Sequence, residues 1–367
     1  MPPGIGSAGG GFEVFKRRSP DSRLNLSSNE LLHPRIGEVL RQALTEVDPE
    51  LLRRYPVGAG AIAAIADFFG IPEDEFLVTP GSDSALRLVC AHYAASSGDN
   101  GQILLQYPNY DVWENVSALH RLPLERVGGG PDDQAARLLA RARATNGALV
   151  VVSVPNGPGG WVFSGAQLDE LTRVAAERDH LLVIDSCYQA FDGPIGAQLA
   201  RRGGPVLVVQ TLSKSHGLAG ARVGLLAGAP GRIHELARTQ LEQTVSGVTL
   251  QVVRAMLDRA DVLEEIWADI RSARSLAERR LRERGLEPLP SGGNFLTVPL
   301  GTAQRAAATE RALSTAGYRV KNLSAITGMA GCLRFTVGDQ DTTESAVRAL
   351  LAGLSTVGEP DDAVTAP

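Results

Sequence analysis

Six short apolar runs, mostly separated by helical patterns, limit the fold of this chain more than any other feature. They are rich in Val, Leu and Ile and barely alternate in polarity, which is typical of strands buried on both faces of a sheet. The runs are Phe76–Thr79, Gln102–Gln106, Ala148–Ser153, Leu181–Ile184, Val206–Gln210 and Val223–Ala227. Because strands and helices alternate along the middle of the chain, the pattern predicts a mainly parallel sheet covered by helices on both faces.

The pattern changes near Asp261, where apolar residues begin to recur at three- and four-residue intervals among many charges, up to Gly285. This spacing predicts one long amphipathic helix. The later segments are the apolar runs 294–300 and 332–337, with a helix expected around 305–316 between them. We therefore predict three parts: an N-terminal segment (1–40) that packs with the small domain, a large α/β domain (41–255), and a C-terminal α+β domain (256–367) whose tail from Gly358 frays.

Charge and cysteine content exclude several classes of protein. The chain has 367 residues and a net charge of −5, so nothing indicates a surface for nucleic acid. Its three cysteines, Cys90, Cys187 and Cys332, are far apart and fit neither a disulfide framework nor a zinc site. No apolar run is long enough for a membrane helix, and the first residues lack a secretory signal pattern. We expect a cytoplasmic protein that binds neither nucleic acid nor membrane.

Lys214 is the strongest candidate for chemistry. It lies in the segment Gln210–Gly224, at the end of a predicted strand and among small residues. A lysine amine becomes a nucleophile when burial or nearby cations lower its pKa, which suits Schiff-base formation. Ser213 and Arg222 offer a hydroxyl and a positive charge to one phosphate group. The alternative is a surface turn that happens to expose a lysine.

Two further segments point to the same chemistry. Asp185 stands at the end of another predicted strand, where a carboxylate can keep a pyridine nitrogen protonated. The alternative is an Asp that caps the next helix. The segment Thr79–Ser84 joins a strand to a helix, and free N–H groups at such a helix start bind phosphate. Its alternative is an ordinary N-cap.

Taken together and in this order, these segments resemble the fold-type-I pyridoxal-phosphate enzymes of the class I and II aminotransferase superfamily, above all the histidinol-phosphate aminotransferase branch. The resemblance extends from about Leu24 to Leu351. Its markers are Arg54–Pro56, Pro80–Asp83, Tyr107–Tyr110, Pro155–Gly160, Asp185–Tyr188, Ser213–Arg222 and Cys332–Gly338. It implies pyridoxal 5′-phosphate as cofactor and a mainly parallel seven-stranded α/β sheet with helices on both faces, joined to a smaller α+β domain.

The resemblance also implies roles for residues around the cofactor ring. Lys214 forms the Schiff base and later moves protons, Asp185 pairs with the ring nitrogen, and Tyr188 approaches the phenolic oxygen. Tyr110 stacks on the ring. The phosphate is held by small and charged residues from two segments: Gly81, Ser82, Asp83, Ser213 and Arg222. Tyr55 reaches the phosphate of a neighbouring subunit's cofactor, which implies a homodimer.

The substrate side departs from the family pattern. The asparagine that normally donates to the phenolic oxygen is Gly157 here, with Asn156 beside it as a candidate replacement. The segment Asn29–His33 keeps the first asparagine, expected near the substrate, but lacks the family's tyrosine. Lys321 falls at or next to a family arginine, while Arg334 matches the one that binds the substrate's carboxylate or phosphate. These changes argue against histidinol phosphate as the substrate.

We therefore predict amino-group transfer between an amino acid and a keto acid. The alternative keeps the same Schiff base but leads to β- or γ-elimination, replacement or cyclisation, as in specialised metabolism. A regulator without catalysis is disfavoured because Lys214 and Asp185 are both present. Two nearby residues, His216 and Cys187, are interpreted as a packed or solvent-facing histidine and a buried small residue rather than as catalytic groups.

Overall fold

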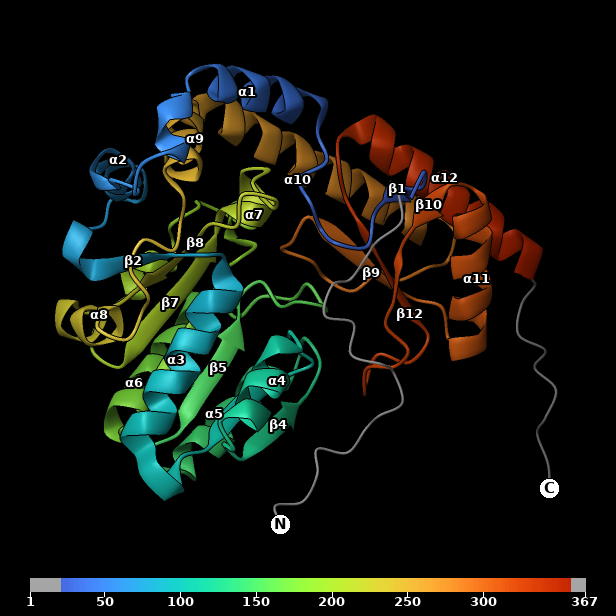
Figure 1. Cartoon of the computed structure of the whole chain (residues 1–367). Helices are drawn as coiled ribbons and strands as arrows, with labels where there is room; N and C mark the ends of the chain where they lie inside the picture. Colours follow the sequence, from blue (N-terminus) through green and yellow to red (C-terminus); the bar gives the residue numbers. More distant parts are fainter. Residues whose placement is uncertain (1–20, 358–367) are drawn as a thin grey trace, which may run out of the picture.

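The computed structural model describes residues 21–357 (Figure 1). The first half of the predicted N-terminal segment and the predicted fraying tail, 358–367, lie outside the described residues. Two sheets dominate the described part: a seven-stranded sheet in the large α/β layer and a three-stranded sheet on the other side of the molecule.

The seven-stranded sheet has the strand order β2-β8-β7-β6-β5-β3-β4. Its strands are β2 Phe76–Thr79, β3 Ile103–Tyr107, β4 Leu124–Gly128, β5 Leu149–Ser153, β6 Leu181–Asp185, β7 Val206–Thr211 and β8 Gly224–Ala227. Five strands, from β7 to β4, are parallel, and β8 is antiparallel to both of its neighbours. The predicted fold class, a mainly parallel seven-stranded sheet, is confirmed.

Strand β4 has no counterpart among the six strands predicted from apolar runs. It forms an edge of the sheet, and among residues 21–357 it pairs only with β3. Its sequence, Leu-Glu-Arg-Val-Gly, carries two charges, and those side chains pair with residues of flanking helices: Glu125 with Arg141 and Arg126 with Glu114. An edge strand is buried less than a central one, so it lacks the continuous apolar run that identifies the other six.

Helices cover both faces of the large sheet. The twelve helices within residues 21–357 are α1 Pro34–Thr45, α2 Ala59–Phe69, α3 Ser82–Ser97, α4 Val112–Leu119, α5 Gln134–Arg143, α6 Gly165–Glu177, α7 Leu212–Ser215, α8 Pro230–Ala237, α9 Gly247–Leu257, α10 Ala260–Arg282, α11 Ala303–Thr315 and α12 Gln340–Val357. Short 3-10 turns are η1 Pro49–Leu52, η2 Glu73–Glu75, η3 Gly98–Asn100, η4 Gln189–Phe191 and η5 Leu199–Arg201. None of the helices in this range combines the length and the apolar character needed to cross a bilayer.

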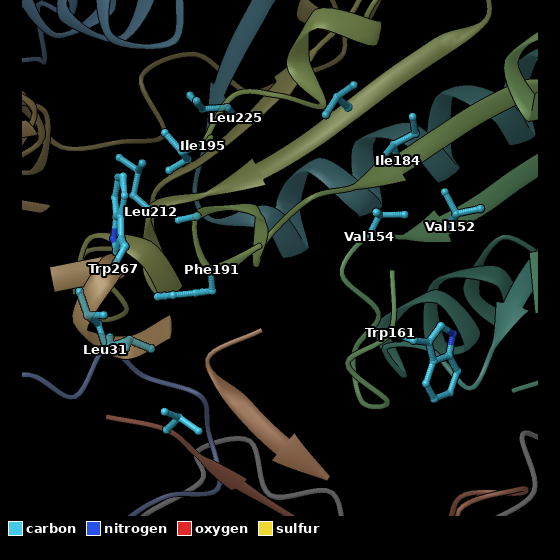
Figure 2. Packing of buried hydrophobic residues seen from close by; sticks show 14 of the residues in the cluster. Leu31, Val152, Val154, Trp161, Ile184, Phe191, Ile195, Leu212, Leu225 and Trp267 are labelled. Atoms are coloured by element: carbon cyan, nitrogen blue, oxygen red, sulfur yellow. The ribbon is translucent and has the colours of Figure 1, made fainter. Parts of the chain in front are cut away.

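The two faces of the sheet belong to two separate core clusters. Along β5, Val150 and Val152 pack with residues of α5, α6 and α10, whereas Leu149 and Val151 pack with residues of α3, α4 and α8. Figure 2 shows part of the first cluster, in which Val152 lies on the strand next to that of Ile184. Successive strand residues alternate between two apolar layers, which explains why the runs show no polar alternation.

The C-terminal part has the α+β character that the sequence predicts. The long helix α10 is followed by the sheet β11-β12-β9, whose strands are Lys321–Asn322, Cys332–Thr336 and Phe295–Pro299. The N-terminal strand β1, Leu24–Asn25, pairs with β10, Tyr318–Arg319. This pairing supports our proposal that the N-terminal segment packs with the small domain, and we keep the division at residues 40 and 255 as a proposal.

Candidate active site

The candidate site lies at one edge of the large sheet, where several strands end. Strands β3, β5, β6 and β7 are parallel, so their carboxyl ends share that edge. Strand β2 ends there too, because β8 is antiparallel to both β2 and β7. Loops at the carboxyl ends of strands are where open α/β sheets bind ligands. The predicted cofactor residues from Gly81 to Lys214 follow these strand ends, and so the fold brings them to one edge.

Lys214 lies in α7, a single helical turn directly after β7. The side chain of Thr211 caps this turn by accepting a hydrogen bond of 3.2 Å from the Ser213 N–H. Trp267 of α10 donates its indole N–H to the Ser215 carbonyl at 2.6 Å and ties the turn to the first core cluster. The Lys214 ammonium donates to the Ser28 carbonyl at 2.7 Å. Lys214 is thus fixed in two ways: its helical turn is held by Trp267, and its ammonium group by the Ser28 carbonyl.

Glycines form a close backbone cradle beside the start of α3. Gly81 has φ 80°, which favours glycine, and a Cβ on it would lie 2.7 Å from a guanidinium nitrogen of Arg222. A Cβ on Gly224 would lie 2.6 Å from the Ser82 nitrogen. The helix start, the guanidinium and the bare backbone therefore come together, as an anion site requires.

Two polar groups at this cradle fit a phosphate. The Ser213 hydroxyl is buried and has no hydrogen-bond partner in the described part of the chain. Arg222 is in the left-handed region at φ 56° and pairs loosely with Asp83 at 3.3 Å. A non-glycine residue held in that conformation is typical of functional sites. The hydroxyl, the arginine and the helix start give a phosphate donors from three directions.

Asp185 at the end of β6 is buried and accepts a hydrogen bond of 3.2 Å from the Cys187 N–H. Burial raises the pKa of its carboxyl, since the charged form loses its hydration. A protonated pyridine nitrogen beside it would offset that cost. Burial also raises the pKa of the Cys187 thiol well above its usual value, in keeping with a buried small residue.

Tyr188 stands where three parts of the chain meet. Its hydroxyl oxygen accepts a hydrogen bond of 3.0 Å from the Asn29 side-chain amide. Its ring packs edge to face on Phe295, with 5.1 Å between the ring centroids. Gly157 lies against the same ring, because a Cβ there would be 3.3 Å from a Tyr188 ring carbon.

Arg334 on β12 supplies a half-buried positive charge beside Phe295. One nitrogen of its guanidinium donates to the Ser27 carbonyl at 2.9 Å, and the group lies 5.3 Å from the centroid of the Phe295 ring. Its Nε is buried without a partner among residues 21–357. Burial lowers the pKa of this arginine. A guanidinium whose buried Nε has no partner is suited to bind an anion. Lys321 pairs with Arg334 in the strand register, on the same face, but it is exposed.

Three other predicted residues have distinct settings. Tyr110 follows β3 and is 42% exposed, and burial of its hydroxyl, with Asp83 nearby, raises its pKa. The Asn156 amide is engaged locally, donating to the Pro108 carbonyl at 2.9 Å and accepting from the Gly159 N–H at 2.8 Å. Tyr55 is 84% exposed.

The sequence alone does not reveal the Ser27 and Ser28 carbonyls, the ring of Phe295 or the contact of Gly224 as parts of the site. Backbone carbonyls leave no mark in a sequence, and Phe295 is one apolar residue in an apolar strand. His216 is packed, as interpreted. It contacts Trp267 edge to face, and burial lowers its pKa to about 3.

Comparison with known proteins identifies the family of this chain. The family model described as aminotransferase class I and II matches residues 21–350. A histidinol-phosphate aminotransferase of Burkholderia lata is 32% identical over 89% of this chain and 88% of its own length. Another, from Chlorobium phaeovibrioides, is 30% identical over 84% of this chain and 85% of its own. The crystal structure of histidinol-phosphate aminotransferase from Sinorhizobium meliloti, in complex with pyridoxal phosphate, has a TM-score of 0.78 at 22% identity, covering 92% of both chains, and so shares the fold.

The fold and the site define a pyridoxal-phosphate-dependent transferase. The chain belongs to the class I and II aminotransferases, and it is most similar to their histidinol-phosphate branch. The comparisons do not favour the elimination, replacement or cyclisation alternative.

Proposed function

We propose that this aminotransferase acts on an α-amino acid whose carboxylate is held by Arg334, with Lys214 as the attachment point of the cofactor. The observation that carries the proposal is the half-buried guanidinium of Arg334, whose buried Nε has no hydrogen-bond partner among residues 21–357, near Lys214. Both side chains contact the neighbouring carbonyls of Ser27 and Ser28, which places them close together.

On the cofactor side, each residue has a definite task. Bound pyridoxal phosphate supplies an electron sink that stabilises negative charge on the substrate's α-carbon. Lys214 moves a proton at that carbon, and Asp185 keeps a proton on the ring nitrogen. Tyr188 donates its hydroxyl proton to the phenolic oxygen, while Tyr110 covers the ring. The phosphate is held by Arg222 and by the hydroxyl and backbone groups of the cradle.

On the substrate side, charge favours a carboxylate over a phosphate. A phosphomonoester carries about 1.5 to 2 negative charges at neutral pH, whereas a carboxylate carries one. Arg334 is a half-buried cation with one charge, and Lys321 opposite it is exposed. His33 replaces the family tyrosine and is occupied as the N-cap of α1, accepting from the Arg35 N–H at 3.3 Å. We therefore assign α-amino acids rather than histidinol phosphate, and give Lys321 at most a steering role.

We further propose a homodimer in which Tyr55 completes the phosphate site of the partner. Leu52 and Val57 flank Tyr55 and are 78% and 84% exposed, which is unusual for apolar side chains and indicates an interface. The test is complementation between two damaged subunits, Lys214→Ala and Tyr55→Ala. A mixed dimer regains one intact site, so mixing should restore activity beyond that of either variant alone. No recovery after verified subunit exchange would contradict a shared site.

The three cysteines are free and buried, which supports our proposal of a cytoplasmic location.

The function is tested with single-turnover spectra. The enzyme loaded with pyridoxal phosphate is mixed with individual α-amino acids or with histidinol phosphate, and its visible absorbance is followed. We expect an α-amino acid to convert the cofactor to its aminated form, and a keto acid to restore it. Release of ammonia and keto product with no keto acid added would identify elimination instead. Conversion by histidinol phosphate alone would overturn the substrate assignment.

A further inference from the structure

The short segment Ser27–Asn29 contacts Arg334 on the substrate side of the proposed site, and Lys214 and Tyr188 on its cofactor side. Its two serine carbonyls accept hydrogen bonds from Arg334 and Lys214, which any residue could provide through its backbone. The contact of Asn29 with Tyr188 is different, because it is made by the asparagine side chain. This hydrogen bond therefore depends on which amino acid occupies position 29, unlike the two backbone contacts.

The structure places the nitrogen of the Asn29 amide 3.0 Å from the Tyr188 hydroxyl oxygen, and an amide nitrogen can only donate. The amide oxygen points toward the Thr336 hydroxyl at 3.4 Å, although that hydroxyl has a closer acceptor in the Leu26 carbonyl at 2.9 Å. A hydroxyl oxygen that accepts a hydrogen bond leaves its own proton free to point elsewhere. The proton of Tyr188 is thus turned away from Asn29.

Asn29 is held rigidly enough to fix this orientation. It is 1% exposed and has φ 55°, a left-handed conformation that asparagine tolerates better than most residues. Its N–H donates to the Thr336 hydroxyl at 3.0 Å, and its carbonyl accepts from the Asn294 amide at 3.2 Å. The residue is therefore anchored to β12 and to the approach to β9.

The arrangement matters because of the neighbouring glycine. Gly157 touches the edge of the Tyr188 ring but has no side chain to donate to the phenolic oxygen of a bound cofactor. The amide of Asn156 is already engaged with Pro108 and Gly159. Since position 157 has no side-chain amide, the hydrogen bond to the phenolic oxygen depends on the hydroxyl of Tyr188.

We propose that Asn29 is a positioning residue which directs the hydroxyl proton of Tyr188 toward the phenolic oxygen of the cofactor and so compensates for Gly157. This inference rests on the proposed function and deepens it. Asn29 then acts through Tyr188, in place of the direct substrate contact expected from its place in the sequence.

The test follows the visible absorbance of the enzyme with bound pyridoxal phosphate as the pH is changed. The midpoint is the pH at which half of this spectral change has occurred. A hydrogen bond from Tyr188 to the charged phenolic oxygen lowers that midpoint. A variant in which the Tyr188 hydroxyl is no longer aligned should therefore have a higher midpoint. We expect Asn29→Gly, which suits the left-handed backbone, to raise the midpoint by about half a unit to one unit. Asn29→Asp keeps the shape but accepts the Tyr188 proton, so its midpoint should rise further.

A double-mutant cycle separates positioning from a structural role. In a Tyr188→Phe background, Asn29→Gly should leave the midpoint unchanged, because its effect passes through the missing hydroxyl. Asn322→Ala is the control: it removes side-chain hydrogen bonds with Glu310 and with the Ser324 N–H, neither of which anchors Asn29, and should lower the melting temperature without moving the midpoint. The dissociation constant for pyridoxal phosphate is measured for each variant by equilibrium dialysis.

Two results would overturn the inference. One is an unchanged midpoint in Asn29→Gly despite weaker cofactor binding, and the other is an equal rise in the Tyr188→Phe background. A wild-type chain that takes up no pyridoxal phosphate would instead refute the proposed function itself. These failures are distinguishable, since the first two require a normally loaded wild-type enzyme.

Discussion

In the proposed site, the cofactor half and the substrate half are built from different parts of the chain. The cofactor half comes from strand ends of one sheet: Gly81 after β2, Asp185 at the end of β6 and Lys214 after β7. The substrate half combines Arg334 on β12 with the segment Ser27–Asn29, about 300 residues apart in sequence. A continuous sheet fixes the first half directly, whereas long-range contacts assemble the second.

The difference suggests where each half tolerates change. The cofactor half keeps most of the residues that the resemblance implies, while the substrate side departs at Gly157, His33 and Lys321. A shared cofactor requires one geometry, but substrates differ between enzymes of one fold. If this comparison is right, substitutions in the cofactor half should abolish chemistry, and those in the substrate half should tune it.

The largest effect is expected for Lys214→Ala. Removing the amine removes the covalent attachment and the proton-transfer group, so turnover should fall by more than about 1,000-fold. The yellow colour of the loaded enzyme should be lost with it. Borohydride reduction of the wild type followed by peptide mass spectrometry identifies the attachment point. A labelled peptide that does not contain Lys214 would refute the assignment of the cofactor half.

Asp185→Asn should separate activity from stability. Turnover should fall by about 100-fold or more, because an amide cannot hold the ring nitrogen protonated. The folded chain raises the pKa of this carboxyl, so its ionised form opposes folding at neutral pH, and this penalty disappears as the pH falls below the carboxyl's ordinary pKa. Asparagine never ionises. The cofactor-free variant should therefore melt at a higher temperature than wild type at pH 7, and the difference should shrink at pH 4.

Calorimetry of the cofactor-free proteins at both pH values checks this expectation. The Cys187 N–H that Asp185 binds can bond equally well to an asparagine oxygen, so local structure is preserved. Equal melting temperatures at pH 7 would mean that the buried carboxyl has a compensating partner in the folded chain.

Arg334→Lys sharpens the comparison from the other side. A lysine cannot reproduce a two-pronged guanidinium contact with a carboxylate. Losing one charged hydrogen bond, worth roughly 1.5–3 kcal/mol, should reduce kcat/KM by about 10- to 100-fold. Cofactor loading should stay normal, as measured by absorbance after dialysis. Lys321→Ala is the matched control, with an expected change below about threefold because that side chain is exposed. If Arg334→Lys loses cofactor instead, the two halves are not separable.

The same contrast explains what the sequence could predict. Lys214 and Asp185 each follow an apolar strand directly, so one local pattern locates them and the parallel sheet brings them together. The partners of Arg334 and Tyr188 depend on a fold-wide approach of segments with no shared local signal. Strand β4 could not be predicted for a related reason, since its charged edge lacks the apolar run on which strand prediction depends.

Gly157→Asn tests whether a departure in the substrate half has a purpose, and its expected effect is the smallest. An amide there would donate to the phenolic oxygen, and such a hydrogen bond to a charged group lowers the pH midpoint of the loaded enzyme by about one unit. A Cβ at this position would lie 3.3 Å from the Tyr188 ring, so the new side chain also narrows the space beside the cofactor. KM for a bulky amino acid should therefore rise more than KM for alanine. A lower midpoint with unchanged KM values would mean that the glycine affects only the electronics of the cofactor. An unchanged midpoint would show that Tyr188, oriented by Asn29, already saturates the phenolic oxygen.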